Sequence, residues 1–340
     1  MDRIDIKLFR SLLQGETSAP LSMDPRRSYR AVARSLGIDE LTVRNRLQKL
    51  RRMGFLKGWH LFVNPSLLGL NLVQLLVDVQ ASSKGDLIEK LRLLPGIAAI
   101  VEHVGNSMYV VFAFKDEGSL EKQARLIEQL AGAKSSPRLR VRFPNCRLGL
   151  SYTDAEIIRA LARDPRKMYS AVAKKLGFSS KTVKRRMQRL IEEKAVFVIP
   201  SMDPSALEGA MVADLLVRYS GREGTAVVNR RILSELDDCV IRAVVGDPDY
   251  GLFNLIITRI SAVREIPKRV GSFAGVASGR VDIVQGRLEM YDELSELLEG
   301  REVSRSRAMP SYGPASTEIE LRPTARRNRS GNRGWRPDPD

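Results

Sequence analysis

The stretch DPRKMYSAVAKKLGFSSKTVKRRMQRL, residues 164–190, has a near copy earlier in the same chain. The earlier copy, residues 24–50, reads DPRRSYRAVARSLGIDELTVRNRLQKL, and the two align at one fixed offset without a gap. Self-similarity of this kind is the sequence signature of an internal repeat. We therefore expect the chain to be a tandem duplication.

Each copy has the spacing of a helix-turn-helix. Gly37 and Gly177 follow a leucine at the end of the first helix, where glycine supplies the positive φ of a helix C-terminus. Asp39 and Ser179 are natural N-caps for the second helix. Apolar residues at i, i+4 and i+7 predict one buried stripe on that helix. The stripe consists of Val43, Leu47 and Leu50 in the first copy and Val183, Met187 and Leu190 in the second.

The opposite stripe of each second helix carries side chains that bind phosphates and read base edges. The residues that we expect to contact DNA are Thr42, Arg44, Asn45 and Gln48, and Ser180, Lys181, Thr182, Lys184, Arg185 and Gln188. The first copy is less basic, because Glu40 and Leu41 share its stripe. Arg46 and Arg186 lie nearer the buried stripe, so we expect them to be structural. An ordinary solvated face is the competing interpretation, and the recurrence of the whole arrangement favours DNA.

Composition narrows the class of protein. A chain of 340 residues exceeds the size of one hydrophobic core, so more than one domain is expected. The formal net charge of +16 favours a polyanionic partner but says nothing of sequence specificity. No apolar run is long enough to cross a bilayer and the N-terminus lacks a signal-peptide pattern, so we expect a cytoplasmic chain without a membrane partner.

Residues for catalysis or metal binding are sparse. Cys146 and Cys239 lie far apart without a C-x-x-C pattern, so neither a disulfide framework nor a zinc site is expected. There are only two histidines, no glycine-rich phosphate loop and no G-x-S-x-G motif. We therefore predict no catalytic residue, no metal and no cofactor.

The remaining elements follow the same duplicated order. Amphipathic helices are expected at 4–13 and 153–161, with a surface loop at about 14–23. Apolar segments at 54–63 and 195–200 follow the second helices, and we interpret the first as a strand pair with a turn, so that each copy carries a β-wing. Residues 72–79 and 212–219 then alternate with period two, which predicts strands with one apolar face for helices and one half-apolar face for a second sheet.

From these strands onward each copy reads as β-α-β-β-α-β, a ferredoxin-like unit. The expected helices are 85–94, 117–130, 224–236 and 262–273, and the expected further strands are 97–104, 108–114, 139–143, 240–245, 251–257 and 281–284. A final helix is expected at 288–298. The arginine-rich end, residues 300–340, has few core-forming residues and is expected to be disordered, either as a sequence-blind DNA arm or as a solvated tail.

With these parts in order, the chain resembles the Lrp/AsnC (feast/famine) transcription regulators. The matching residues are AVAKKLGFSSKTVKRRMQRL at 171–190, DPSALEG at 203–209 and GDPDY at 246–250. Subunits of that family carry a winged helix-turn-helix and a β-α-β-β-α-β effector domain, and they dimerise with their sheets face to face. The resemblance implies an α+β fold of two repeats, each a winged helix-turn-helix and a ferredoxin-like (RAM-type) domain, forming an intramolecular pseudo-dimer.

The domains expected on this basis are winged helix-turn-helices at 1–66 and 150–206, ferredoxin-like effector domains at 67–149 and 207–299, and a basic tail at 300–340. The implied partner is double-stranded DNA, with further self-association of pseudo-dimers. Two recognition helices would enter successive major grooves about 34 Å apart. Because the helices have diverged, we expect an asymmetric operator.

The resemblance also implies a small effector, commonly an amino acid, near the loop between the second and third strands of the effector domain. Gly246, Asp247 and Asp249 match the family's Gly-Asp-x-Asp pattern, whereas Gly105 and Asn106 of the first copy depart from it. The alternative for all five is a tight turn, where Gly, Asn and Asp are common.

A row of arginines forms a second candidate anion site. Arg138, Arg140 and Arg142 alternate along a strand and would hold an anionic effector or a phosphate. A solvated edge that discourages strand pairing is the alternative.

Two readings from other classes remain. Siroheme decarboxylases share the winged-helix and effector-domain architecture, but their His-Asn-Tyr pattern is missing here and His103 is the only histidine in the corresponding region. We expect that histidine to be structural. A sequence-blind architectural DNA-binding protein is the other alternative, and its affinity would depend on salt alone.

Overall fold

The computed structural model describes residues 1–13, 29–79, 83–133, 136–221, 223–245 and 247–290. All of them fall within one compact unit, Met1–Arg305. The predicted loop at 14–23, Gly246, the tail at 300–340 and most of the predicted last helix lie outside these residues. No helix in the described part of the chain is long and apolar enough to span a membrane.

Two helix-turn-helix units form where the repeat predicts them. Gly37 and Gly177 adopt φ values of 66° and 71° at the turns. The Asp39 side chain accepts a hydrogen bond from Thr42 N at 2.7 Å, and Ser179 caps the second unit in the same way. The helices are α1 (Arg3–Leu13), α2 (Tyr29–Leu36) and α3 (Glu40–Arg52), and α6 (Tyr152–Leu161), α7 (Tyr169–Leu176) and α8 (Ser180–Glu192).

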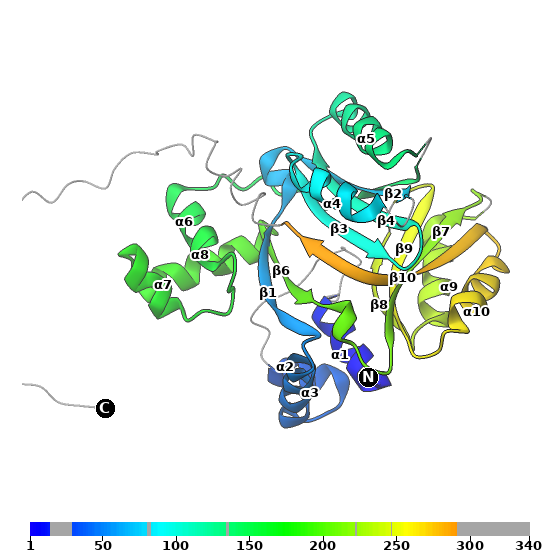
Figure 1. Cartoon of the computed structure of the whole chain (residues 1–340). Helices are drawn as coiled ribbons and strands as arrows, with labels where there is room; N and C mark the ends of the chain where they lie inside the picture. The colour runs from blue at the N-terminus through cyan, green and yellow to red at the C-terminus, as the bar shows by residue number, and fades with distance from the viewer. Residues whose placement is uncertain (14–28, 80–82, 134–135, 222, 246, 291–340) are drawn as a thin grey trace, which may run out of the picture. The chain divides into compact units, whose positions relative to one another are not determined.

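Each helix-turn-helix is followed by a ferredoxin-like unit (Figure 1). The strand orders β5-β2-β4-β3 and β10-β7-β9-β8 are the same permutation of the chain order. The first unit consists of β2 (Asn71–Asp78), α4 (Lys84–Arg92), β3 (Ile97–His103), β4 (Ser107–Phe114), α5 (Glu117–Ala131) and β5 (Arg138–Val141). The second consists of β7 (Met211–Tyr219), α9 (Thr225–Glu235), β8 (Val240–Val244), β9 (Tyr250–Ile257), α10 (Ala262–Gly271) and β10 (Val276–Glu289).

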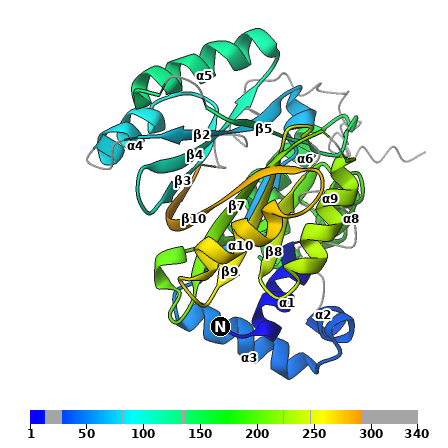
Figure 2. The same cartoon turned by 90° about the vertical axis from the view of Figure 1, so that its right-hand side faces the viewer.

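The two faces of each sheet have different neighbours. One face packs on the helices of its own unit, α4 and α5 in the first and α9 and α10 in the second (Figure 2). Side chains of the opposite faces, including Leu72, Val101, Val212 and Leu252, belong to one shared core. Apolar burial of this kind stabilises contact between layers without directional bonds. The half-apolar strand faces are therefore where the two units meet.

The last strand differs from the prediction. Residues 281–284 were expected to be a short strand and Leu288 to begin a helix, but β10 runs unbroken to Glu289. Its first part pairs with β7, and its last part pairs with the edge strand β3, where Leu288 lies opposite Ile100. Pairing satisfies backbone groups that an edge strand otherwise leaves open. One strand thus joins the two sheets.

The predicted strand pair within 54–63 is wrong. This segment forms the single strand β1 (Leu56–Val63), which pairs antiparallel with β6 (Val196–Met202) of the other copy. Gly58 makes no turn and lies at an irregularity of the register. Both strands bury apolar side chains, including Trp59 and Val198, in the core that the two repeats share, and this burial stabilises their pairing. We call this two-stranded sheet the β1–β6 ribbon.

Both cysteines are free thiols. Burial raises the pKa of Cys239 to about 12, and burial also raises the pKa of Cys146. At pH 8 the reactive thiolate of Cys239 is therefore on the order of a thousandfold scarcer than in an ordinary cysteine. We expect iodoacetamide to label Cys239 slowly in the native protein and quickly in guanidinium, as followed by mass spectrometry. Complete labelling of native Cys239 within minutes would contradict the assignment.

Candidate nucleic-acid interface

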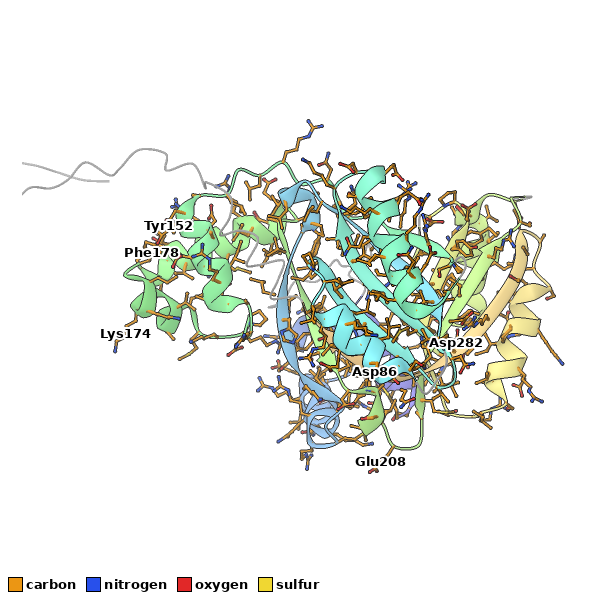
Figure 3. All side chains as sticks on the ribbon, turned by 45° about the horizontal axis from the view of Figure 1, so that its top comes forward. Asp86, Tyr152, Lys174, Phe178, Glu208 and Asp282 are labelled. Atoms are coloured by element: carbon orange, nitrogen blue, oxygen red, sulfur yellow. The ribbon has the colours of Figure 1, made fainter. Side chains whose placement is uncertain are left out.

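Helix α8 presents a basic face to solvent. Val183, Met187 and Leu190 are buried on its inner side. The outer side exposes Ser180, Lys181, Lys184, Arg185 and Gln188. Among the described residues, no ion pair engages the two lysines or Arg185, so these cations remain available to a polyanion. Lys174 on α7 also extends away from this unit (Figure 3).

Helix α3 presents a weaker version of the same face. Asn45 and Gln48 are exposed, but the guanidinium of Arg44 is bonded to Glu40 at 2.8 Å. Thr42 is half-buried, and its two hydrogen bonds lower the pKa of the capping carboxyl of Asp39. This helix therefore has less free positive charge than α8.

Thr182 matches Thr42 in the second unit. Its hydroxyl lies 2.8 Å from that of Ser179, the residue that caps α8. Both predicted threonines thus stabilise the start of the second helix of a helix-turn-helix. The Gln188 amide donates to Glu192 at 3.1 Å, one turn further along α8.

Arg46 and Arg186 have the structural role expected of them. Arg46 lies 2.7 Å from the buried carboxylate of Asp5, so it fastens α3 to α1. Arg186 lies 3.0 Å from the buried Asp154 and fastens α8 to α6. Each ion pair thus fixes the last helix of a helix-turn-helix unit against the first helix of that unit.

The candidate effector turn is occupied by its own hydrogen bonds. The buried Asp247 carboxylate accepts from the backbone N–H groups of Asp249 at 2.9 Å and Tyr250 at 3.0 Å. It also accepts from Arg140 N of β5 at 3.0 Å, which joins the turn to the other repeat. These are the bonds of a tight turn.

The equivalent turn in the first repeat contains Gly105 and Asn106. Gly105 has a φ of 91°, and the Asn106 carbonyl accepts from Val79 N at 2.6 Å. The structure brings Gly105 and Asn106 together, and Asp247 and Asp249 together, but as turn residues. Gly246 lies outside the described residues.

The arginine row on β5 is largely neutralised by helix α5. Arg138 is bonded to Glu121, and both N–H groups at the end of Arg140 donate to Glu117 at 2.6 and 2.7 Å. The hydrogen bond from Arg140 lowers the pKa of Glu117. Arg142 is exposed. The row therefore matches the solvated-edge interpretation better than an anion site.

Comparison with known proteins identifies the family. Residues 150–191 match the AsnC-type helix-turn-helix domain, and residues 1–57 match a winged helix-turn-helix DNA-binding domain. Over 124 residues the chain is 36% identical to the HTH-type transcriptional regulator Ptr1 of Methanocaldococcus jannaschii. That alignment covers 36% of this chain and 78% of Ptr1. The chain belongs to the Lrp/AsnC family of transcription regulators.

Another curated relative of the Lrp/AsnC type also aligns with only part of this chain. The HTH-type transcriptional regulator FL11 of Pyrococcus horikoshii is 28% identical over 138 residues, which are 40% of this chain and 85% of FL11. Among solved structures, the siroheme decarboxylase NirDL with an iron-uroporphyrin III analogue covers 88% of this chain and 99% of its own. Its TM-score is 0.50 at 15% identity, which shows a common fold and nothing more.

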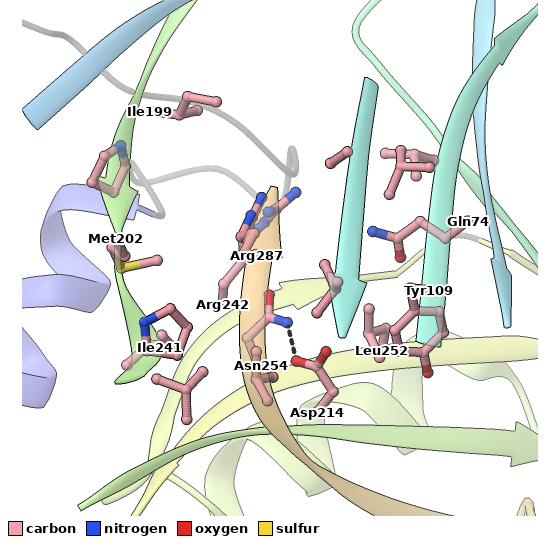
Figure 4. Close-up of a pocket in the computed structure, with 18 of the residues that line it drawn as sticks. Gln74, Tyr109, Ile199, Met202, Asp214, Ile241, Arg242, Leu252, Asn254 and Arg287 are labelled. Carbon is pink, nitrogen blue, oxygen red and sulfur yellow. Dashed lines mark hydrogen bonds between the residues drawn. The ribbon is translucent and has the colours of Figure 1, made fainter. Parts of the chain in front are cut away.

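A cavity of about 80 Å³ lies between the two sheets of this Lrp/AsnC chain (Figure 4). Its walls are mainly apolar. Its polar lining residues are Gln74, Tyr109, Asp214, Arg242, Asn254 and Arg287. No motif in the sequence predicts this site. The signal that could have indicated it is a pair of polar residues, Gln74 on β2 and Asp214 on β7. They occupy corresponding positions on the half-apolar faces of the first strands of the two ferredoxin-like units.

A buried polar network adjoins the cavity and joins the repeats. His103 Nε2 lies 3.1 Å from Asp214 Oδ2, and its Nδ1 lies 3.1 Å from the Ser107 hydroxyl. The Asn254 amide donates to Asp214 Oδ1 at 2.6 Å. Ser107, His103 and Asp214 follow one another as the residues of a catalytic triad do. His103 is fully buried and Ser107 is only 2% exposed, however, so no substrate reaches the serine hydroxyl. The network is structural, as expected of His103.

Proposed function

We propose that this chain is a sequence-specific DNA-binding transcription regulator whose α3 and α8 enter two successive major grooves. The observation that carries the proposal is the pair of capped helices, each with an exposed polar or basic face and a buried stripe. One such helix would be compatible with an ordinary solvated surface. Two in one compact unit match the requirement for binding two half-sites.

The β1–β6 ribbon supports a two-fold arrangement of the helices. Helix α3 leads into β1 at Leu56, which pairs with Met202, whereas α8 leads into β6 at Val196, which pairs with Val63. The chain therefore enters the ribbon at opposite ends. At about 3.4 Å per residue these ends are on the order of 25 Å apart. With the helices projecting beyond them, this spacing is compatible with about 34 Å between successive grooves.

We further propose that the two repeats act as an intramolecular pseudo-dimer. The shared core between the sheets and the pairing of β10 with β3 support this reading. A duplicated chain needs no second molecule to present two recognition helices. It also frees the two helices to diverge, since each contacts only one half-site.

A genome-wide binding map with a footprint on the strongest site tests this function. We expect a recurring motif that is asymmetric, because α3 and α8 carry different side chains. Its two halves should lie about 10 base pairs apart, because the helices would enter successive major grooves. Protection should extend over both halves. A footprint limited to one half-site, or affinity that is indifferent to sequence, would refute the proposal and favour architectural binding.

A further inference from the structure

We propose that the cavity between the two sheets binds a small carboxylate with an apolar tail of about three or four carbons, and that this ligand is the effector. The effector role rests on the proposed function. Binding of the ligand does not, because it can be measured without DNA. The site is separate from the turn at Asp247, whose carboxylate is already bonded within the protein.

The size and walls of the cavity select the tail. At about 10–15 Å³ for each water, 80 Å³ holds roughly five to eight waters, which is space for a ligand of about six or seven non-hydrogen atoms. Apolar side chains from both repeats surround it, including Leu72, Val101, Val111, Val212, Ile241 and Leu252. A short aliphatic tail would be removed from water on all sides.

Two buried polar groups point to a ligand. Tyr109 Oη and Gln74 Oε1 are buried, and neither has a hydrogen-bond partner among the described residues. Buried polar atoms are ordinarily paired, because an unpaired one loses its bonds to water without replacement. The Tyr109 hydroxyl can donate to a carboxylate, and so can the Gln74 amide once it is turned over.

The arginines select the anionic head. Arg242 and Arg287 both line the cavity and extend in the same direction (Figure 4), while Asp214 is the one acid that lines it. Guanidinium groups bind carboxylates through paired N–H donors. The Arg287 side chain is oriented by Glu289, whose carboxylate lies 3.1 Å from its Nε.

The position of the cavity links it to the recognition helices. Phe62 of β1 and Met202 of β6 line it, and these strands form the ribbon into which α3 and α8 lead. Ile241 of β8 also lines the cavity, and it follows Val240, whose carbonyl accepts a hydrogen bond from Arg10 of α1 at 2.8 Å. A ligand here contacts both repeats at once and bears on the spacing of the two helices.

Calorimetry with 3-methylbutanoate and its neutral amide tests the inference on the full chain. We expect the carboxylate to bind one site per chain, and the amide to bind at least tenfold more weakly. Arg287→Met should weaken carboxylate binding at least tenfold, and Ala99→Leu should abolish it by filling the cavity. Arg218→Met, an exposed charge on β7, is the matched control and should bind as the unaltered chain does.

Each failure has a separate meaning. No binding at millimolar carboxylate, or equal binding by Ala99→Leu with an unchanged circular dichroism spectrum, would overturn the site. Carboxylate binding that leaves the affinity for operator DNA unchanged would overturn the effector role. If the chain binds the carboxylate but no DNA, the proposed function fails and the cavity site stands.

Discussion

Replacing Lys181, Lys184 and Arg185 together with alanine is expected to weaken operator binding about a hundredfold near 0.15 M salt. The three side chains are exposed on α8, and each charge-assisted bond to a phosphate contributes about 1 kcal/mol. Each lost contact also removes about one unit from the slope of log affinity against log salt. Fluorescence anisotropy over a salt series measures both quantities.

Two controls separate local contacts from overall charge. Arg44→Ala on α3 should weaken binding less than about threefold, because Glu40 already holds that guanidinium. Alanine at Lys115, Lys122 and Arg264, three exposed cations of the effector domains, removes the same charge elsewhere. If this second triple variant loses as much affinity and slope as the first, α8 is not the interface and binding is a general electrostatic effect.

Local signals in the sequence were sufficient for the helices and for the order of the ferredoxin-like units. The stripe of Val183, Met187 and Leu190 is buried as its spacing predicts, and Gly177 ends α7 in the left-handed region. These features depend on residues a few positions apart. Their physical causes, burial of one helix face and freedom from Cβ strain, act within a single element.

The errors occurred where distant segments pair. The partner of β1 is β6 of the other repeat, and no local pattern distinguishes that pairing from a hairpin. The same holds for Leu288, whose helical spacing was outweighed by the open edge of β3. Register between remote strands depends on tertiary context, so strand propensity alone could not predict either contact.

The candidate sites divide in the same way. Exposed positions on α3 and α8 follow from helix periodicity, so Arg185 and Asn45 could be placed in advance. The cavity could not, because Gln74 and Asp214 come from different sheets and meet only after the two repeats pack together. A polar residue on a strand reads as solvated until the layer that covers it is known.

Asp214→Ala is expected to lower the free energy of unfolding by about 3 kcal/mol. Its carboxylate is almost fully buried and is the shared partner of the His103 ring and the Asn254 amide, so alanine leaves the buried Nε2 of His103 and the half-buried Asn254 amide without this partner. Because those groups come from different repeats, the loss should loosen the packing between the sheets. Urea unfolding followed by circular dichroism measures the change.

Asp214→Asn and Asp86→Ala complete the comparison. Asparagine keeps the size of the side chain and one acceptor oxygen, so about half of the lost stability should return. Asp86 is an exposed acid at the start of α4 (Figure 3), and its removal should cost less than about 1 kcal/mol. An Asp214→Ala chain as stable as Asp86→Ala would mean that the bonds from His103 and Asn254 do not hold the repeats together. The proposed effector role would then fail as well. A ligand in the adjoining cavity can change the spacing of α3 and α8 only if the two sheets are held rigidly together.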